Sequence, residues 1–192
     1  AQAVSEHPGG RFNPLFIYGG VGLGKTHLMH AIGNYINAKF PQKRIMYITT
    51  DKYIADYVES IRDSKTSVAF REKYRSVDVL MIDDIQFIAS KQGTQEALFH
   101  TFNDLYQNDK HIIISSDRPP KEIAPLEERL RTRFQWGLLA DIQPPDIETR
   151  IAILKKKADA ENFYLSDDVA SFIASNMENN IRDLEGLLNK VM

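Results

Sequence analysis

The chain has 192 residues, of which 43% are hydrophobic, 24 are Lys or Arg and 26 are Asp or Glu, giving a formal net charge of −2. It contains no cysteine, which excludes disulfide bonds and thiolate metal sites, and no apolar run approaches the length of a membrane span. The charge gives no global reason to expect nucleic-acid binding, so any such contact must be local. We expect a soluble, intracellular protein with one α/β domain and a small appendage, or with two small domains.

The first motif along the chain is a glycine-rich loop at residues 19–26 that fits the phosphate-loop pattern G-x-x-x-x-G-K-[ST]. It follows an apolar run at 15–18, which is typical of a buried strand, and precedes a segment with helical periodicity. A polyphosphate must be wrapped by converging backbone N–H groups, and glycine allows this because it has no side chain. We expect Lys25 to contact the outer phosphates and Thr26 to coordinate Mg²⁺ at the positive end of the helix.

Two other interpretations of this loop are weaker. A dinucleotide-binding fingerprint has a different glycine spacing, and it gives Lys25 and Thr26 no task. A flexible loop that matches by chance would not need a strand before it and a helix after it. The motif therefore predicts a protein that binds a nucleoside triphosphate.

Short apolar runs alternate with helical periodicity as far as residue 142, which predicts a parallel sheet with covering helices. The runs are at 15–18, 45–49, 79–82, 112–115 and 138–142. Gln143-Pro144-Pro145 ends the pattern, and everything beyond it is typical of helix. We therefore predict an α/β nucleotide-binding domain over 1–145 and an incomplete helical lid over 146–192.

In the expected lid, Asp146 and Ser166 can each cap a helix. Helical spacing predicts two buried faces, formed by Ile147, Ile151, Leu154 and Ala158 and by Val169, Phe172, Ile173 and Met177.

The run at 77–84 ends in two carboxylates, Asp83 and Asp84. At the end of a buried strand beside a phosphate loop, one carboxylate can orient Mg²⁺ and its water ligands while the next polarises the attacking water. We assign Asp83 to the metal and Asp84 to the water. An ordinary turn after a strand is the alternative, because aspartate is common in turns.

Two later segments also carry charge that can reach a phosphate. Asp117 follows the run at 112–115, and a strand lying beside the phosphate-loop strand would bring it near the γ-phosphate; a plain loop is the alternative. Arg129 and Arg133 share one helical face. A cation there can reach a phosphate held by a neighbouring subunit, although a solvated charged helix is the commoner case for a Glu/Arg stretch.

Five motifs in order resemble the AAA+ ATPase domain of the DnaA family of bacterial replication initiators, over nearly the whole chain. They are Thr26-His27-Leu28, 82–87 (Ile-Asp-Asp-Ile-Gln-Phe), 115–119 (Ser-Ser-Asp-Arg-Pro), 131–138 (Arg-Thr-Arg-Phe-Gln-Trp-Gly-Leu) and 180–186 (Asn-Ile-Arg-Asp-Leu-Glu-Gly). The resemblance implies a P-loop NTPase of AAA+ type, with a five-stranded parallel sheet flanked by helices and then a small α-helical lid.

The resemblance also implies roles for particular residues. Asp117 corresponds to the first sensor and Arg133 to the arginine finger offered to the adjacent protomer. Arg182 corresponds to the second sensor, reaching from the lid to the γ-phosphate of its own protomer, and Arg129 is expected to support the subunit contact. The expected ATP/ADP-binding set is Gly20, Gly22, Leu23, Gly24, Lys25, Thr26 and His27.

In that family the ATP form assembles into a filament at the replication origin and helps to open the strands, whereas the ADP form is inactive. The resemblance therefore implies an ATPase that works as a switch, because only the γ-phosphate differs between the two states. Many fast relatives have Glu where this chain has Asp84, and the shorter side chain predicts slow hydrolysis. The implied partners are other copies of the chain, origin single-stranded DNA and a replicative helicase.

By resemblance, Val58, Lys91 and Thr94 are the candidates for contact with single-stranded DNA. Val58 lies in a helical insertion expected at 51–75, where Ile54, Tyr57 and Ile61 are instead expected to pack against the sheet. Gly93 stands where some relatives have a basic residue, which weakens one expected phosphate contact.

The duplex-reading helix-turn-helix and the amino-terminal partner-binding regions of the family are expected outside this chain, so we do not expect it to recognise an origin sequence. We expect it in the bacterial cytoplasm, at the nucleoid. Two alternatives share the fold: a helicase loader, and a regulatory adaptor that holds ADP. Intact Lys25, Thr26, Asp83 and Asp84 disfavour the adaptor, which has no need to hydrolyse ATP.

Overall fold

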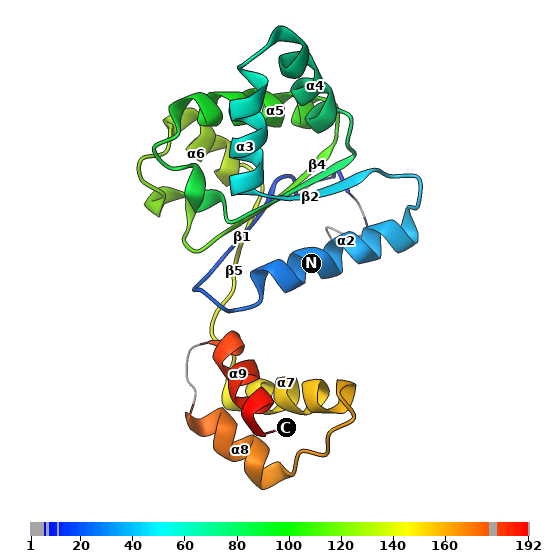
Figure 1. Cartoon of the computed structure of the whole chain (residues 1–192), viewed down its shortest axis with the longest axis vertical. Coiled ribbons are helices and arrows are strands. Elements are labelled where there is room, and N and C mark those ends of the chain that lie inside the picture. The colour runs from blue at the N-terminus through cyan, green and yellow to red at the C-terminus, as the bar shows by residue number, and fades with distance from the viewer. Residues whose placement is uncertain (1–5, 7, 11, 177–179, 192) are drawn as a thin grey trace. The chain divides into compact units, whose positions relative to one another are not determined.

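The computed structural model describes residues 6, 8–10, 12–176 and 180–191 (Figure 1). The chain divides into two compact units. The first, here called the sheet unit, comprises Ala1–Tyr18 and Lys25–Asp141. The second, here called the loop–lid unit, comprises Gly19–Gly24 and Ile142–Met192, so the glycine loop belongs with the helices that follow the sheet.

The sheet unit is built on five parallel strands in the order β2-β3-β4-β1-β5. The strands are β1 (Leu15–Tyr18), β2 (Ile45–Thr49), β3 (Val79–Asp83), β4 (His111–Ser116) and β5 (Leu138–Asp141). Each predicted strand is confirmed, with ends that differ by at most one residue. Because all five strands are parallel, their carboxyl ends share one edge of the sheet, which is where ligands bind in folds of this class.

Helices cover both faces of the sheet (Figure 1). Helix α2 (Lys25–Lys39) lies on one face, where a Cβ at Gly33 would be 3.2 Å from the sulfur of Met81. The other face carries α3 (Thr50–Ser60), α4 (Ser64–Arg75), α5 (Gln92–Gln107) and α6 (Glu128–Gln135). Period-two alternation divides the strand side chains between the faces: Phe16, Leu80, Ile82, Ile112 and Ile114 join the core on the α3–α6 side.

The insertion between β2 and β3 forms two helices, α3 and α4, that are held together by aromatic packing. The ring of Tyr53 lies 4.8 Å from that of Tyr74 and 5.4 Å from that of Phe70, measured between centroids. Sequence spacing did not identify this cluster, and its prediction that Ile61 packs inward is wrong, because Ile61 is 66% exposed. The buried contact between α3 and α4 is formed instead by the rings of Tyr53, Phe70 and Tyr74.

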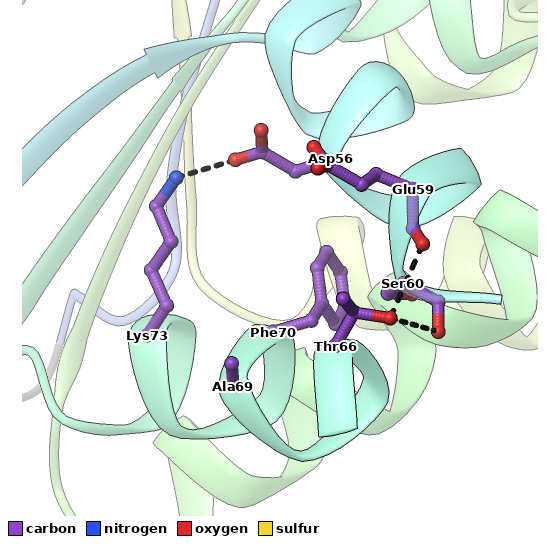
Figure 2. A pocket seen from close by; sticks show the side chains of 7 residues that line it. All are labelled: Asp56, Glu59, Ser60, Thr66, Ala69, Phe70 and Lys73. Carbon is purple, nitrogen blue, oxygen red and sulfur yellow. Dashed lines mark hydrogen bonds and ion pairs between the residues drawn. The ribbon is translucent and has the colours of Figure 1, made fainter. Parts of the chain in front are cut away.

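A polar network also joins α3 to α4 around a pocket of about 230 Å³ (Figure 2). The Asp56 carboxylate pairs with Lys52 on its own helix and with Lys73 across the pocket, and it accepts a hydrogen bond from Tyr74. Burial alone would raise the pKa of Asp56, but these three donors lower it to about 2. The two helices of the insertion are therefore held together by ion pairs and a hydrogen bond as well as by aromatic packing.

The loop–lid unit contains α7 (Ile147–Ala160), α8 (Asp167–Asn176) and α9 (Ile181–Val191). The predicted cap on α7 is confirmed, since the Asp146 carboxylate accepts the backbone N–H of Thr149 at 2.7 Å. Its buried core consists of Leu154, Ala158, Leu165, Ala170, Ile173, Ala174, Leu184 and Leu188.

The predicted faces of the lid helices are only partly correct. Ile147 is 42% exposed and Phe172 is 71% exposed, although both were expected inside. Helix α8 buries Ala170 and Ala174 instead, because small side chains allow close approach of its neighbours. Met177 lies outside the described residues. Within the described part of the chain, no helix is both long and apolar enough to span a membrane.

Candidate nucleotide site and nucleic-acid interface

Asp83 is the centre of the polar cluster at the carboxyl edge of the sheet. Its side chain is buried, and it accepts hydrogen bonds from the hydroxyls of Thr26 and Tyr47, each at 2.7 Å, and from the Ser115 hydroxyl. Burial by itself would raise the pKa of Asp83, but these donors outweigh it and lower the pKa below its ordinary value. The carboxylate is therefore held ionised. Burial raises the pKa of Tyr47 above its ordinary value, and the hydrogen bond to Asp83 raises it further.

The pair Thr26 and Asp83 fits a magnesium ion. Their oxygens lie 2.7 Å apart at the start of α2 and the end of β3, and hydroxyl and carboxylate oxygens are the ligands that hard cations prefer. Among the described residues there is no cluster of three or more His, Cys, Asp or Glu side chains that could hold a metal alone. Mg²⁺ is commonly held by one or two protein groups while water and substrate phosphates complete its shell.

Asp84 has an unusual backbone conformation. Its φ of 58° and ψ of 51° lie in the left-handed region, which is uncommon for a residue with a side chain. Its backbone N–H donates to the Ser115 hydroxyl at 2.9 Å, and that hydroxyl in turn donates to Asp83. The reversal turns the chain directly after β3, so consecutive carboxylates are placed in different surroundings. Such conformations cluster at functional sites.

Asp117 lies just beyond the carboxyl end of β4, as predicted. Arg118 holds its carboxylate with two bonds of 2.7 and 2.9 Å, and this pairing is the main reason that the pKa of Asp117 lies below its ordinary value. The charge of Lys25, which is itself buried, lowers that pKa further. The sheet unit therefore brings together Lys25, Thr26, Asp83, Asp84 and Asp117. His27 lies on the same helix as Lys25 and is exposed.

The glycine loop in the loop–lid unit has a conformation that requires glycine. Gly22 and Gly24 have φ values of +77° and +87°. A Cβ at Gly22 would lie 1.7 Å from the side-chain oxygen of Asn180, and the Gly22 carbonyl accepts the Ile181 backbone N–H at 3.1 Å. The loop therefore contacts the beginning of α9, directly before Arg182, whose side chain is exposed. Of the other predicted loop residues, Leu23 is buried and Gly20 is exposed.

The two arginines on α6 have different environments. The guanidinium of Arg129 pairs with Glu127 at 2.6 Å and lies 4.6 Å from the centre of the Phe99 ring. The guanidinium of Arg133 instead stacks on Trp136, 3.7 Å from the ring centre. Stacking engages the face of a guanidinium and leaves its N–H donors, which lie in the plane, for other partners. The predicted shared face is confirmed, but Arg129 is already paired within its own chain.

The candidates for DNA contact lie on α3 and at the start of α5. Val58 is 45% exposed and Lys91 is exposed, whereas Thr94 is only 4% exposed. A Cβ at Gly93 would lie 2.9 Å from the Tyr57 hydroxyl, so the two helices meet there. Lys91 occupies the N-cap position of α5 and makes no side-chain cap hydrogen bond. The first-turn N–H groups of α5 are therefore not capped by that side chain.

From the sequence alone, Tyr47 received no role, and Gln86 and Ser115 entered only as parts of motifs. Tyr47 is on an edge strand, where an aromatic side chain with a polar tip is common and carries no specific signal. Gln86 donates to the Asp84 carboxylate and accepts from the Asp117 backbone N–H. Only the reversal at Asp84 creates this contact, and periodicity cannot reveal such a reversal.

Comparison with known proteins gives one consistent result. A sequence profile described as the bacterial DnaA ATPase domain matches residues 1–141. A chromosomal replication initiator protein DnaA from Caldanaerobacter subterraneus subsp. tengcongensis is 60% identical over 190 residues, covering 99% of this chain and 43% of that protein. The chain therefore spans less than half the length of that relative.

Two solved structures are similar over almost the whole chain. Domain III of the replication initiation protein DnaA from Thermotoga maritima superposes with a TM-score of 0.92 at 50% identity, covering 96% of this chain and 77% of that one. A replication initiator DnaA bound to AMPPCP and single-stranded DNA superposes with a TM-score of 0.90 at 37% identity, covering 99% of this chain and 58% of that one.

Proposed function

Since this chain belongs to the bacterial DnaA ATPase domain family, we propose that it binds ATP with Mg²⁺, hydrolyses it slowly, and uses the bound nucleotide to control assembly on replication-origin DNA. One observation carries the proposal: the Thr26 hydroxyl and the buried Asp83 carboxylate meet at 2.7 Å directly after a phosphate-loop sequence. A buried carboxylate held by hydroxyl groups suits exchange of those partners for a bound cation and its waters.

Nucleotide binding uses the backbone N–H groups of Gly20, Gly22, Leu23 and Gly24, with Lys25 on the outer phosphates and His27 beyond them on α2. Thr26 and Asp83 would hold Mg²⁺, which would supply positive charge to neutralise the phosphates. Arg182 contacts the γ-phosphate from the lid. The parts of the chain that carry these roles are the nucleotide-binding domain over 1–145 and the lid over 146–192.

Hydrolysis uses Asp117 as the first sensor and Asp84 as the residue that acts on the attacking water. Asp84 orients a water whose oxygen forms a bond to the γ-phosphorus while the bond from that phosphorus to the β–γ bridging oxygen breaks. The electron pair of that bond leaves with ADP, and the proton of the water passes to the released phosphate. Asp84 is one methylene shorter than the Glu of many fast AAA+ enzymes, and slow turnover suits a switch.

Assembly uses Arg133 as the cation that reaches the nucleotide of a neighbouring copy. Its stacking on Trp136 supports this role, because the guanidinium is held in place while its N–H donors remain directed along its plane. The γ-phosphate is the only group that distinguishes ATP from ADP, so Arg133 and Arg182 together make the filament depend on it.

DNA contact uses Val58 and Lys91, with Thr94 contributing its backbone N–H because its side chain is buried. The DnaA structure that holds single-stranded DNA supports this, as does the uncapped start of α5, where backbone N–H groups suit a phosphate. A replicative helicase is a further partner. We place the protein in the bacterial cytoplasm at the nucleoid.

Release of inorganic phosphate from ATP in the presence of Mg²⁺ tests the proposal. We expect slow release that requires Mg²⁺, is lost in Lys25→Ala, and is retained when the exposed Lys190 is replaced by Ala. Binding of ATP without any release would favour the ADP-holding adaptor, and failure to bind ATP would contradict the proposed function.

A further inference from the structure

Gln86 bridges two residues to which the proposed function gives separate tasks. Its side-chain Nε2 donates to the Asp84 carboxylate at 3.2 Å, and its Oε1 accepts the backbone N–H of Asp117 at 3.3 Å. Gln86 lies in the short 3-10 helix Ile85–Ile88 that follows β3, whereas Asp117 follows β4. The amide therefore connects the ends of two neighbouring strands.

The direction of the Gln86 amide is fixed by its surroundings. A backbone N–H can only donate, so the Gln86 oxygen must face Asp117. The Gln86 NH₂ group must then face Asp84, where an ionised carboxylate can only accept. Both halves of the amide are satisfied in one orientation, and the reverse orientation would place two donors together and two acceptors together.

The hydrogen bond from Gln86 to the Asp84 carboxylate matters because the backbone of Asp84 is already held in place. Asp84 has a left-handed backbone conformation directly after β3, and its N–H donates to the Ser115 hydroxyl at 2.9 Å. The Asp84 side chain itself still has rotational freedom about its own bonds. Gln86 restricts that freedom by binding one carboxylate oxygen, which leaves the other for a water.

Gln95 provides a useful contrast within the same unit. It has the same two-sided pattern, accepting the backbone N–H of Glu127 at 2.8 Å and donating to the carbonyls of Ile88 and Pro125 at 3.1 Å. All of its partners are backbone groups, so it joins segments of chain. Gln86 differs because one of its partners is a carboxylate at the candidate site.

We infer that Gln86 is a positioning residue that orients the Asp84 carboxylate toward its water and ties that orientation to the strand end that carries Asp117. This rests on the proposed function, in which Asp84 holds the attacking water. If a shift of β4 moves the Asp117 backbone, the Gln86 amide moves with it, and its hydrogen bond to the Asp84 carboxylate changes.

The test is a double-mutant cycle read by single-turnover hydrolysis at saturating ATP and by ATP affinity. We expect Gln86→Leu and Gln86→Glu each to slow hydrolysis at least about 10-fold while the Kd for ATP stays within about 3-fold of wild type. The Glu variant can still accept from Asp117 but cannot donate to Asp84. Gln107→Leu, at an exposed position at the end of α5, is the control and should hydrolyse normally.

The cycle separates this inference from a merely structural role. If Gln86 acts through Asp84, Gln86→Leu should cause no further loss in an Asp84→Ala background. The same fold-loss in both backgrounds, or wild-type hydrolysis by either Gln86 variant, would overturn the inference while leaving the proposed function intact. An Asp84→Ala variant that hydrolyses at the wild-type rate would overturn the proposed role of Asp84, and this inference with it.

Discussion

The two ends of the central sheet are both polar, but their charged groups are balanced in different ways. At the amino end, Asp78 pairs with the Lys110 ammonium and accepts the Arg44 backbone N–H at 2.8 Å. At the carboxyl end, the hydroxyls of Thr26, Tyr47 and Ser115 hold Asp83. Asp78, which the chain's own cation neutralises, suits a role in the fold, whereas Asp83, which neutral donors hold, suits a cation that arrives with a ligand.

The same contrast recurs on α6. Arg129 is paired with Glu127, whereas Arg133 lies on the Trp136 ring. In each pair, the residue whose charge is neutralised within the chain, Asp78 or Arg129, should matter to stability. The other residue, Asp83 or Arg133, should matter to ligand binding and assembly. Changes at each kind of group test this division.

The largest expected effect follows replacement of Arg133 by Ala. Loss of a cation that stabilises charge on a transferring phosphoryl group typically costs about 1,000-fold or more in rate. We expect ATP-dependent assembly to disappear and assembly-dependent hydrolysis to fall by that order, measured by light scattering and phosphate release. Arg129→Ala is the matched change on the same face and should weaken assembly far less, because Arg129 is paired with Glu127 within its own chain. Equal losses in both variants would break the contrast between these arginines.

Asp83→Asn should lower Mg²⁺-dependent hydrolysis by about 100- to 1,000-fold, the usual cost of removing one group that stabilises transition-state charge. The fold should survive, because the Asn oxygen can still accept from the Thr26 and Tyr47 hydroxyls, and its NH₂ group can donate to the Ser115 oxygen. Single-turnover assays across a Mg²⁺ titration, with a thermal melt of the same sample, measure both effects. A variant that melts early yet hydrolyses normally would assign Asp83 to the fold.

At the amino end, His111 should make stability depend on pH. It is 1% exposed, its Nδ1 accepts the Gly9 backbone N–H, and its Nε2 has no partner within the described residues. Burial, and secondarily the charge of Lys43, lower the pKa of His111 from 6.5 to about 4. The unfolded chain binds the extra proton between these values, so stability is complete above about pH 6.5 and falls by up to about 3 kcal/mol as the pH drops to about 4.

Urea unfolding at several pH values between 4 and 7 measures this dependence, and His111→Phe should flatten it. The carboxylates with lowered pKa values, Asp56, Asp78, Asp83, Asp117 and Asp146, also cost stability at low pH, but only as the pH falls below about 5. The loss between about pH 6.5 and about pH 5 is therefore the part that reports on His111. A wild-type curve that is already flat between pH 4 and 6.5 would mean that His111 is not buried in the neutral form.

The smallest effect is expected for Asp78→Ala, which removes the partner of Lys110 and of the Arg44 N–H. Loss of such hydrogen bonds costs about 1–2 kcal/mol of folding free energy, with no change in ATP affinity. Chemical denaturation together with nucleotide titration checks both halves. Weaker ATP binding in this variant would show that the two ends of the sheet are not separable.

The sequence predicted the sheet well because its signals are local. Apolar runs and their bounding turns located all five strands, and a motif identified Thr26 and Asp83 as neighbours in space. Prediction failed where tertiary packing determines which side chains are buried and which ones meet. The buried face of α8 could not be predicted from Phe172 and Val169, because the small residues Ala170 and Ala174 are buried there. The links made by Tyr47 and Gln86 depend on strand order and on the backbone reversal at Asp84, which no spacing rule encodes.

Sedimentation velocity of the wild-type protein with Mg²⁺ and either AMPPCP or ADP, at equal protein concentration, tests the central claim most directly. If groups at the carboxyl end of the sheet and on α6 respond to the γ-phosphate, larger species should form with AMPPCP and not with ADP. Identical sedimentation in the two nucleotides would contradict the account.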